Sequence, residues 1–492
     1  MATDISNDFL PVSGGSSFKD GPLASAPAFF ILAAICFSLY FNEFLAAPVA
    51  LPSALLIVVA LVLFCTVKPV RNWPAIFSLV IILSGLSSAY SLYQVNKNIE
   101  ISGSIETEGT ITSLRSVKYG SALVVKTPYG KFAGYINDGA IPRDGSHVKL
   151  RGALFDFKRA ERKGAFDEML YWRSQGAVKK IVIFEIEEIS PPSGLAKWRA
   201  SVRKAIKGRL LPLTSAYMAA FTSGYRDEDV MELHRMAGTA HLLAVSGLHI
   251  WIIAGLLLAV VRGSLARFVS VAILLWGYLL LAGLPVSGVR AALMAELMLL
   301  SAVIGRPYSS FNSVSAAAVL LLIINPFNFW SVGWRLSVLC ALFITAAIHF
   351  MPRGWVCPVI LSVLLWFVTA PILTSTFGQV PLAGLVLNIF AVPTFGVIFP
   401  VILILSIPPL CELPFSWIAA HASETILYIF QKLLFAGVTL FPGEAVWSTP
   451  MFAVSVSLFA SAVALRCGAD IKRIVFVTFV SLLLLSYSQM ML

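Results

Sequence analysis

The sequence predicts a polytopic α-helical membrane protein of about 11–13 transmembrane helices, with a small all-β domain inserted between two groups of helices. Three observations predict this fold class. The 492-residue chain is 58% hydrophobic and only 12% charged, with a mean hydropathy of +0.86, whereas soluble domains are about 45–50% apolar and about 25% charged. The apolar residues form blocks of about 20, enough to cross a hydrocarbon core of about 30 Å. Between two groups of these blocks lies a stretch with the alternating pattern of β-strands.

The chain begins with a polar segment, residues 1–27, that is rich in Gly and Ser. This segment lacks the basic start and the cleavage site of a signal peptide, so we expect a disordered cytoplasmic tail. Three apolar spans follow within residues 28–95 and form the first group of transmembrane helices. They cover residues 28–46, 49–67 and 73–93.

Charged residues in the short turns between these spans predict their orientation. Lys68 and Arg71 lie between the second and third spans, whereas Glu43 marks the turn between the first and second. Cytoplasmic loops carry an excess of Lys and Arg, so the amino terminus and Lys68 are expected in the cytoplasm. Three crossings then place the following domain outside.

Residues 96–195 are expected to form this extracytoplasmic all-β domain. Five runs alternate between apolar and polar residues and are separated by turn residues. They cover residues 107–117, 121–126, 131–136, 147–153 and 180–186. Five short strands in one segment are typical of a small barrel such as the OB-fold. A basic, partly helical insert, residues 156–176, separates the fourth and fifth strands.

Most of the chain's net charge of +11 lies between residues 97 and 209. Aromatic residues are interleaved with these cations, a combination typical of sequence-tolerant binding to single-stranded nucleic acid. The candidate DNA-binding surface consists of six cations of the β domain: Lys118, Lys126, Lys131, Arg159, Arg162 and Lys163. The alternative is that the aromatic side chains fill the barrel core and the cations only solvate its surface.

Residues 196–237 are expected to form a connector that begins with a basic segment, residues 197–213 (KWRASVRKAIKGRLLPL). Its pattern predicts an amphipathic helix on the membrane surface. Five cations would then be available to phosphates: Arg199, Arg203, Lys204, Lys207 and Arg209. Contact with lipid headgroups alone is the alternative.

Residues 238–492 carry the second group of apolar spans, about ten in number. They cover residues 242–261, 267–284, 286–305, 311–325, 330–350, 356–377, 382–407, 417–440, 450–465 and 474–491. Some are short or interrupted by proline, so re-entrant elements are also expected.

Strongly polar side chains inside these spans indicate a function or an internal pairing, because they are costly in hydrocarbon. In residues 238–250 (GTAHLLAVSGLHI), His241, Ser246 and His249 enter an apolar helix, and Gly247 allows a close helix contact or a kink. Ser246 and His249 could act as nucleophile and base, although no acidic residue lies nearby to orient the histidine. A pore or gating role and buried packing are the alternatives.

A second polar segment is residues 283–296 (GLPVSGVRAALMAE), which places Arg290 and Glu296 inside a span. An arginine at this depth needs either a partner or a wet cavity. Phosphates would be suitable counter-ions along the pathway of a polyanion. An internal ion pair of Arg290 with Glu296 or another acid is the alternative.

Two further segments carry polar residues. Arg335 and Ser337 follow a Trp/Phe cluster, and Arg335 either lines a cavity or reaches the lipid headgroups. Asn388 lies in residues 381–400, where prolines and glycines predict a broken helix that lines a cavity or is buried in protein.

No metal or cofactor site is predicted. The six cysteines form no CxxC pair, and the six histidines form no HxH or HExxH cluster. Nothing resembles a Walker A loop, so any ATPase is expected to be a separate protein.

The four polar segments, in this order, closely resemble the competence domain of the ComEC family of DNA-internalisation proteins. GTAHLLAVSGLHI is nearly the signature of that family, and PVSGVRAALMAE, NPFNFWSVGWRLS and LVLNIFAVP are similar to its other segments. Upstream, KGAFDEMLYWRSQGAV resembles the piece that closes the family's extracytoplasmic OB-like domain. The likeness covers nearly the whole chain after residue 93.

This resemblance implies a channel in the bacterial inner membrane that imports single-stranded DNA during natural transformation and is not itself an enzyme. The DNA path would be lined by His241, Ser246, Gly247, His249, Arg290, Arg335 and Asn388. The implied partners are single-stranded DNA, an external DNA receptor, a separate nuclease, a cytoplasmic motor ATPase or single-strand-binding proteins, and membrane lipids.

Two departures from the family pattern affect this expectation. Arg335 stands where the family usually has Gln. Many members continue into a β-lactamase-like domain thought to degrade the non-transported strand, whereas this chain ends at Leu492 and has no HxHxDH cluster. A channel without the nuclease is therefore expected. The alternatives are an integral-membrane hydrolase that uses Ser246 and His249, a small-solute transporter, and a degenerate member without a role in uptake.

Overall fold

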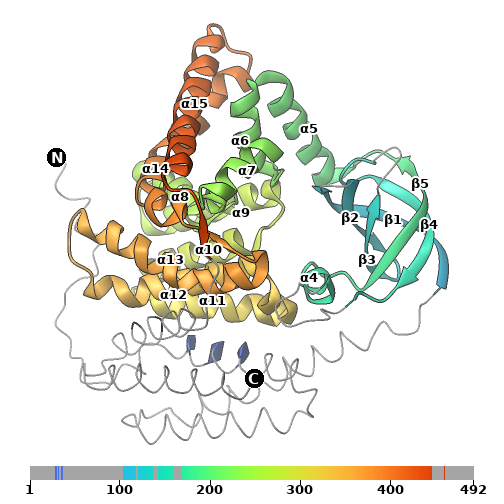
Figure 1. Ribbon diagram of the computed structural model, residues 1–492, viewed down its shortest axis with the longest axis horizontal. Helices are drawn as coiled ribbons and strands as arrows, with labels where there is room; N and C mark the ends of the chain where they lie inside the picture. The colour runs from blue at the N-terminus through green and yellow to red at the C-terminus, as the bar shows by residue number, and fades with distance from the viewer. Residues whose placement is uncertain are drawn as a thin grey trace, which may run out of the picture.

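A computed structural model describes residues 28–29, 31–32, 35–36, 103–117, 120–136, 142–158, 168–225, 227–445, 459 and 462. Several predictions fall outside these residues. They concern the tail, the second and third spans, nearly all of the spans after residue 449, and four DNA contacts. Those four contacts are Lys118, Arg159, Arg162 and Lys163. The described part consists of a β-barrel beside a helical bundle (Figure 1).

Five strands form the closed barrel. They are β1 (Gly103–Val117), β2 (Gly120–Thr127), β3 (Gly130–Ile136), β4 (His147–Phe155) and β5 (Lys179–Ser190). The strand order is β1-β2-β3-β5-β4, and β4 pairs with β1 to close the barrel. Strands β3 and β5 are parallel and the other pairs are antiparallel. The five predicted strands and their OB-like barrel are therefore confirmed.

The barrel follows from the alternation in its strands. Leu123, Val125, Val148 and Leu150 are fully buried and fill its interior, while their neighbours in the sequence face outward. β4 and β5 approach each other closely at Gly152, where a Cβ would lie 2.4 Å from the carbonyl oxygen of Val182.

The insert between the fourth and fifth strands covers one side of the barrel. It contains α4 (Glu168–Ser174), and the buried Trp172 of this helix packs on the outward-facing Ala122, Val124 and Ala133. The aromatic residues of this domain divide between the core and the surface. Phe132 and Trp172 fill hydrophobic cores, whereas Tyr129 and Phe155 are exposed.

Three helices lead from the barrel into the bundle: α5 (Gly194–Arg209), α6 (Pro212–Ser223) and α7 (Glu228–Met236). The predicted basic helix over residues 197–213 is thus wrong at its end. The chain becomes extended at Leu210, and α6 begins with Pro212 in its first turn, where proline's fixed φ favours a new helix start.

The apolar part of the bundle begins after the short turn η2 (Ala240–Leu242). Its elements are α8 (Gly247–Val260), α9 (Ser264–Ala282), α10 (Val286–Val303), α11 (Ser310–Ile324), η3 (Pro326–Trp330), α12 (Val332–Ala347), η4 (Ile348–Phe350), α13 (Val356–Phe377), α14 (Ala383–Leu410) and α15 (Ser416–Leu440). A small sheet pairs β6 (Val380–Pro381) with β7 (Glu444–Ala445).

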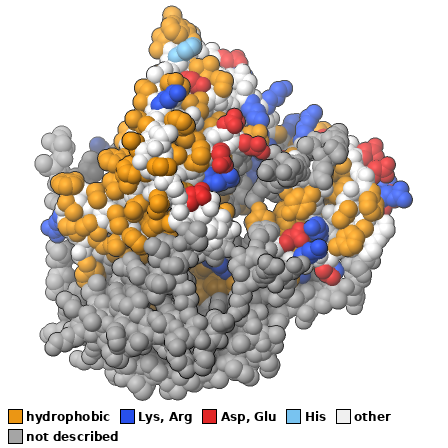
Figure 2. Space-filling model, in the orientation of Figure 1, with side chains coloured by type: hydrophobic (Ala, Val, Ile, Leu, Met, Phe, Trp, Pro, Cys, Tyr) orange, Lys and Arg blue, Asp and Glu red, His pale blue; other side chains and the backbone are white. Residues whose placement is uncertain are grey.

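Within the described residues, four helices are long and apolar enough to cross a membrane: Ser264–Ala282, Val286–Val303, Val356–Thr374 and Ala383–Leu410. Three shorter apolar helices accompany them: α8, α11 and α12. Hydrophobic side chains cover most of the visible face of the bundle (Figure 2). The predicted polytopic helical fold is therefore confirmed, and the total of about 11–13 crossings stays a prediction.

The predicted break in residues 381–400 is wrong. α14 runs through this segment and contains Pro393, Pro400, Pro408 and Pro409. Proline is tolerated in apolar helices of this kind because neighbouring helices and local adjustments satisfy the backbone groups that it frees.

Contacts at two places tie the barrel to the bundle. Arg203 on α5 forms an ion pair with Asp144, in the segment before β4, at 3.4 Å. On the other side, Asn325 donates through Nδ2 to the carbonyl oxygen of Ser174 at 3.3 Å, and the Arg173 guanidinium lies 5.9 Å from the centre of the Phe327 ring. The barrel therefore touches both α5 and η3.

Candidate functional site

The candidate site is built around the turn that joins α7 to α8. Gly238 ends α7 with a φ of +67°, and its Cα faces Gly384 on α14 so closely that a Cβ would lie 2.7 Å from the Gly384 Cα. Asn388, one turn further along α14, donates through Nδ2 to the Gly238 carbonyl oxygen at 3.4 Å. Its Oδ1 is buried and has no hydrogen-bond partner among the described residues. Asn388 thus holds the turn in place.

Ser246 and His249 form the start of α8. The Ser246 hydroxyl lies 2.9 Å from His249 Nδ1, and the Ser246 backbone N–H donates to the same nitrogen at 3.2 Å. This arrangement is a capping box, in which side chains satisfy N–H groups that have no partner inside the helix. The pair therefore has a structural explanation that needs no nucleophile.

The other side of the His249 ring faces aromatic residues. His249 is fully buried, and its ring centre lies 4.3 Å from Phe399 and 5.1 Å from Phe221. Its Nε2 has no hydrogen-bond partner among the described residues. Because Nδ1 accepts the Ser246 N–H, the proton of a neutral ring is on Nε2 and points toward this aromatic surround.

His241 differs from its buried neighbours. Its side chain is exposed, although it lies within electrostatic range of both His234 and His249.

Arg290 lies opposite the start of α8, on α10. It is 7% exposed, and its Nη2 would lie 3.8 Å from a Cβ added at Gly247. Its Nε donates to the Ser337 hydroxyl on α12 at 2.8 Å, and its Nη1 approaches the Met294 sulfur at 3.2 Å. No carboxylate among the described residues lies within ion-pair distance of this guanidinium.

Glu296 does not pair with Arg290. Its Oε1 accepts a hydrogen bond from Trp276 Nε1 on α9. Six residues along a helix correspond to a rotation of about 240°, so the two side chains point to different sides of α10. The predicted alternative of an ion pair with Glu296 is therefore wrong, and no other described acid pairs with Arg290.

Arg335 lies away from Arg290. Its Nε donates to the Phe329 carbonyl oxygen at 2.7 Å, and its guanidinium lies 4.8 Å from the Trp330 ring centre. Ser337 lies two residues later and therefore on the other side of α12. The structure thus brings Gly247, Ser246, His249 and Arg290 together and places Arg335 on the aromatic turn η3.

The cations of α5 have different surroundings from those predicted. Arg199 donates to the Leu280 carbonyl oxygen at 2.7 Å, and Arg209 forms an ion pair with Glu412 at 2.8 Å. Arg203 pairs with Asp144, and Lys207 lies 4.2 Å from the centre of the Tyr225 ring. Only part of this basic helix is therefore available to phosphates, because protein groups already bind the rest.

Two of the predicted barrel contacts lie at the β2–β3 hairpin. Lys126 and Lys131 face each other in the register of this strand pair, and the exposed Tyr129 lies in the turn between them. The hairpin therefore presents two like charges and an aromatic ring to solvent. Within the described ranges no group of three or more His, Cys, Asp or Glu side chains could hold a metal ion.

The sequence was compared with known proteins. A model of the competence protein family matches residues 222–469, which include all four polar segments. This chain belongs to the competence protein family. The matched region begins within α6 and excludes the barrel.

Two curated relatives resemble this competence protein. ComE operon protein 3 of Bacillus subtilis strain 168 is 28% identical over 293 residues, which are 56% of this chain and 38% of the relative. Recombination protein 2 of Haemophilus influenzae is 25% identical over 400 residues, which are 73% of this chain and 50% of the relative. This chain thus spans half or less of these relatives. No solved structure matches it.

The competence region also contains a buried group that the sequence analysis missed. His234 on α7 lies 2.7 Å through Nε2 from the Tyr217 hydroxyl, and Thr239 Oγ1 lies 2.8 Å from His234 Nδ1. All three side chains are buried. The signal for His234 is weak, because the polar α7 resembles an exposed helix and Tyr217 lies on a different element.

Proposed function

We propose that this competence protein conducts single-stranded DNA across the bacterial inner membrane. In this proposal the strand passes beside the start of α8, where His241, Ser246, Gly247, His249 and Arg290 lie, with Asn388 fixing the adjacent turn. The name of one relative, recombination protein 2, supports a role in handling DNA.

The observation that carries the proposal is the charge of Arg290. A buried cation is normally paired, because removing it from water is costly. The partners of Arg290 are a hydroxyl and a sulfur, both uncharged. A passing phosphate would supply the missing negative charge and accept from the planar guanidinium in a bidentate manner.

The same geometry suits transport rather than permanent binding. One arginine with weak neutral partners binds a phosphate without a second charge to hold it. Conduction requires binding that is favourable enough for entry and weak enough for release. Import on this model needs no covalent chemistry, and Ser246 and His249 act by fixing the start of α8.

The distribution of arginine supports an external position for the barrel. Helices α8 to α13 pack on their successive neighbours, and the turns at one end carry Arg262, Arg306 and Arg353. The turns at the other end, residues 283–285, 325–331 and 378–382, carry no Lys or Arg. The barrel contacts this second end through α5 and η3. By the positive-inside rule this end faces outward.

The proposed route has a direct connection from barrel to bundle. α4 of the barrel insert contacts η3, and Arg335 stacks on Trp330 of the same turn. In the proposal, an external receptor delivers DNA to the barrel, a separate nuclease removes one strand, and a cytoplasmic motor ATPase or single-strand-binding proteins draw in the other.

Uptake of labelled duplex DNA into the cytoplasm tests the proposal. Cells lacking the gene should take up no DNA, and the wild-type gene should restore uptake. Arg290→Gln should reduce uptake at least about tenfold, the effect of losing roughly 1.4 kcal/mol of phosphate binding, whereas Arg290→Lys should keep part of it.

Arg306→Gln is the matched control, because it removes the same charge from an exposed position just after α10. It should leave uptake unchanged. Normal DNA entry in the deletion strain would end the proposal.

A further inference from the structure

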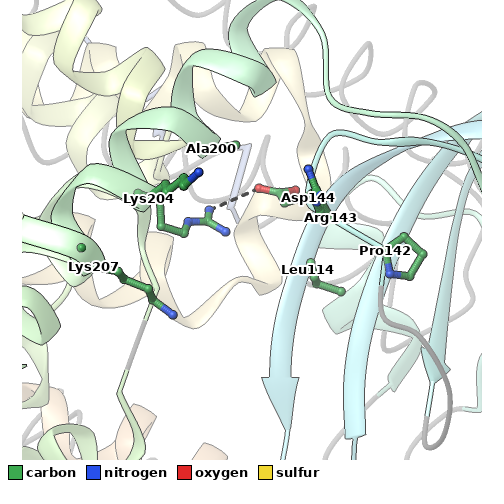
Figure 3. A pocket seen from close by; sticks show the side chains of 9 residues that line it. Leu114, Pro142, Arg143, Asp144, Ala200, Lys204 and Lys207 are labelled. Carbon is green, nitrogen blue, oxygen red and sulfur yellow. Dashed lines mark hydrogen bonds and ion pairs between the residues drawn. The ribbon is translucent and has the colours of Figure 1, made fainter.

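A basic crevice lies between the barrel and α5. Its volume is about 580 Å³, within the roughly 300–1,000 Å³ of ligand pockets. The lining residues that matter for charge are Arg143 and Asp144 on the barrel side and Arg203, Lys204 and Lys207 on α5. Figure 3 shows Lys204 and Lys207 across the crevice from Arg143 and Asp144.

Close packing holds the two walls of this crevice together. Gly145, with a φ of +85°, lies so near α5 that a Cβ would lie 2.2 Å from the Ala196 Cβ. The Arg203–Asp144 ion pair lies two turns further along α5. The shape of the crevice is therefore fixed by the packing of the barrel against α5.

The charges in the crevice are unbalanced. Four cations face one carboxylate, and that carboxylate already binds Arg203. Arg143 and Lys204 are exposed and form no ion pair with any described residue. Arg203 Nε is buried and has no hydrogen-bond partner among the described residues. These groups have donors to spare for a ligand that carries several negative charges.

Two kinds of polyanion carry phosphates that these cations could bind: a single strand of DNA and a layer of lipid headgroups. The orientation of α5 favours the DNA strand. Its apolar face, with Val202 and Ile206, packs on the bundle core, and Arg199 and Arg209 bind carbonyl oxygens at the ends of α9 and α14. Lys204 and Lys207 point toward the barrel rather than away from the protein. A strand passing from barrel to bundle would meet them, whereas a planar layer of lipid headgroups would meet the outer surface.

We infer that this crevice binds the phosphate backbone of single-stranded DNA and guides the strand from the barrel toward the bundle. The inference rests on the proposed function and adds an entry site to it. Lys204, Lys207 and Arg143 contact phosphates, and Tyr225, which lies against Lys207, is available for a base to stack. Binding is independent of sequence, because only backbone charges are read.

Binding of a fluorescent oligothymidylate to the full-length protein in nanodiscs of zwitterionic lipid tests the inference. The double variant Lys204→Gln/Lys207→Gln should bind on the order of tenfold more weakly at low salt. Its slope of log affinity against log salt should be shallower by about 1.4, since each single-strand phosphate contact contributes about 0.7.

The matched control is Lys197→Gln/Arg151→Gln. It also removes two exposed positive charges, one from α5 and one from the barrel, but neither residue lines the crevice. Its affinity and salt slope should equal those of the wild type. Equal binding by the crevice variant and this control would overturn the inference and leave the proposed function to the uptake assay.

Asp144→Asn provides a test with the opposite sign. It removes the one carboxylate that repels phosphates and keeps the shape of the side chain, so affinity should rise severalfold. A wild-type melting temperature for this variant excludes a damaged fold as the cause of any weaker binding. Weaker binding by this variant would overturn the inference, as would loss of wild-type binding when phosphatidylglycerol replaces the zwitterionic lipid, because lipid headgroups would then occupy the crevice.

Discussion

At the residue scale, Arg290 combines a full charge with deep burial and uncharged partners. Such groups are expensive and mark functional positions in membrane proteins. Stability and function should therefore respond to its replacement in opposite directions, as they do at strained or destabilised sites.

Arg290→Met tests this opposition. Methionine has a similar length and no charge, so the free energy of unfolding should rise by on the order of 1–4 kcal/mol, as when buried ionic groups are replaced by apolar ones. DNA uptake should fall at the same time. Thermal unfolding of the purified protein and the uptake assay measure the two effects. A lower melting temperature would mean that Arg290 is a structural residue.

Ser246 should behave as a helix cap. Ser246→Ala removes the hydroxyl beside His249 Nδ1 and should lower the free energy of unfolding by about 0.5–2 kcal/mol. Uptake in cells should remain near the wild-type level. Ser309→Ala is the control, because Ser309 caps α11 in the same manner and should cost a similar amount. Abolished activity with unchanged stability would instead favour a hydrolase.

At the element scale, the contact between Gly238 and Gly384 sets the position of the turn before α8. Both a positive φ and a close backbone contact require glycine at position 238. The turn carries His241 and leads into the cap of α8, so its position determines where the whole site lies.

Gly238→Ala should therefore destabilise the bundle by more than about 1–3 kcal/mol, the cost of a strained backbone conformation alone. It should also reduce uptake. Gly255→Ala, in the middle of α8 with no atom within 4 Å of an added Cβ, should be neutral or stabilising by about 0.5–1 kcal/mol. Similar melting temperatures for these two variants would contradict the role assigned to Gly238.

The sequence predicts elements well where their pattern is local. The strands of the barrel follow from alternation over a few residues, and the predicted span 356–377 coincides with α13. The path of α14 is different, because its prolines favour a break in isolation and only packing against other helices overrides them. The end of α5 was misplaced because apolar residues keep helical spacing past Arg209, at Leu210 and Leu213, while the backbone turns.

The site was predictable as a set of residues but not as a set of contacts. Arg290, Ser246 and His249 stand out because polar groups are rare in apolar spans. The partner of Arg290 is Ser337, which lies on another helix, and no local pattern links them. His234 and Tyr217 were missed for the same reason, because a buried hydrogen bond between two elements leaves no periodic signal.

At the scale of the whole molecule, the arginine-bearing turns and the barrel should lie on opposite sides of the membrane. A cysteine placed at Lys149 on the barrel should react with a membrane-impermeant maleimide in intact protoplasts. A cysteine placed at Arg306 should react only after the membrane is permeabilised. Labelling is compared with that of the parent protein, which has its own cysteines. The reverse pattern would place the barrel in the cytoplasm.

The closure of the barrel has a consequence for its contacts with other chains. Because β4 pairs with β1, every strand has a neighbour on both sides for part of its length, and rows of unpaired backbone groups are shorter than at the edge of an open sheet. Open sheets recruit strands from other chains through such rows, which leads to aggregation. The closed barrel is therefore less open to accidental strand exchange with other chains than an open sheet of the same five strands would be.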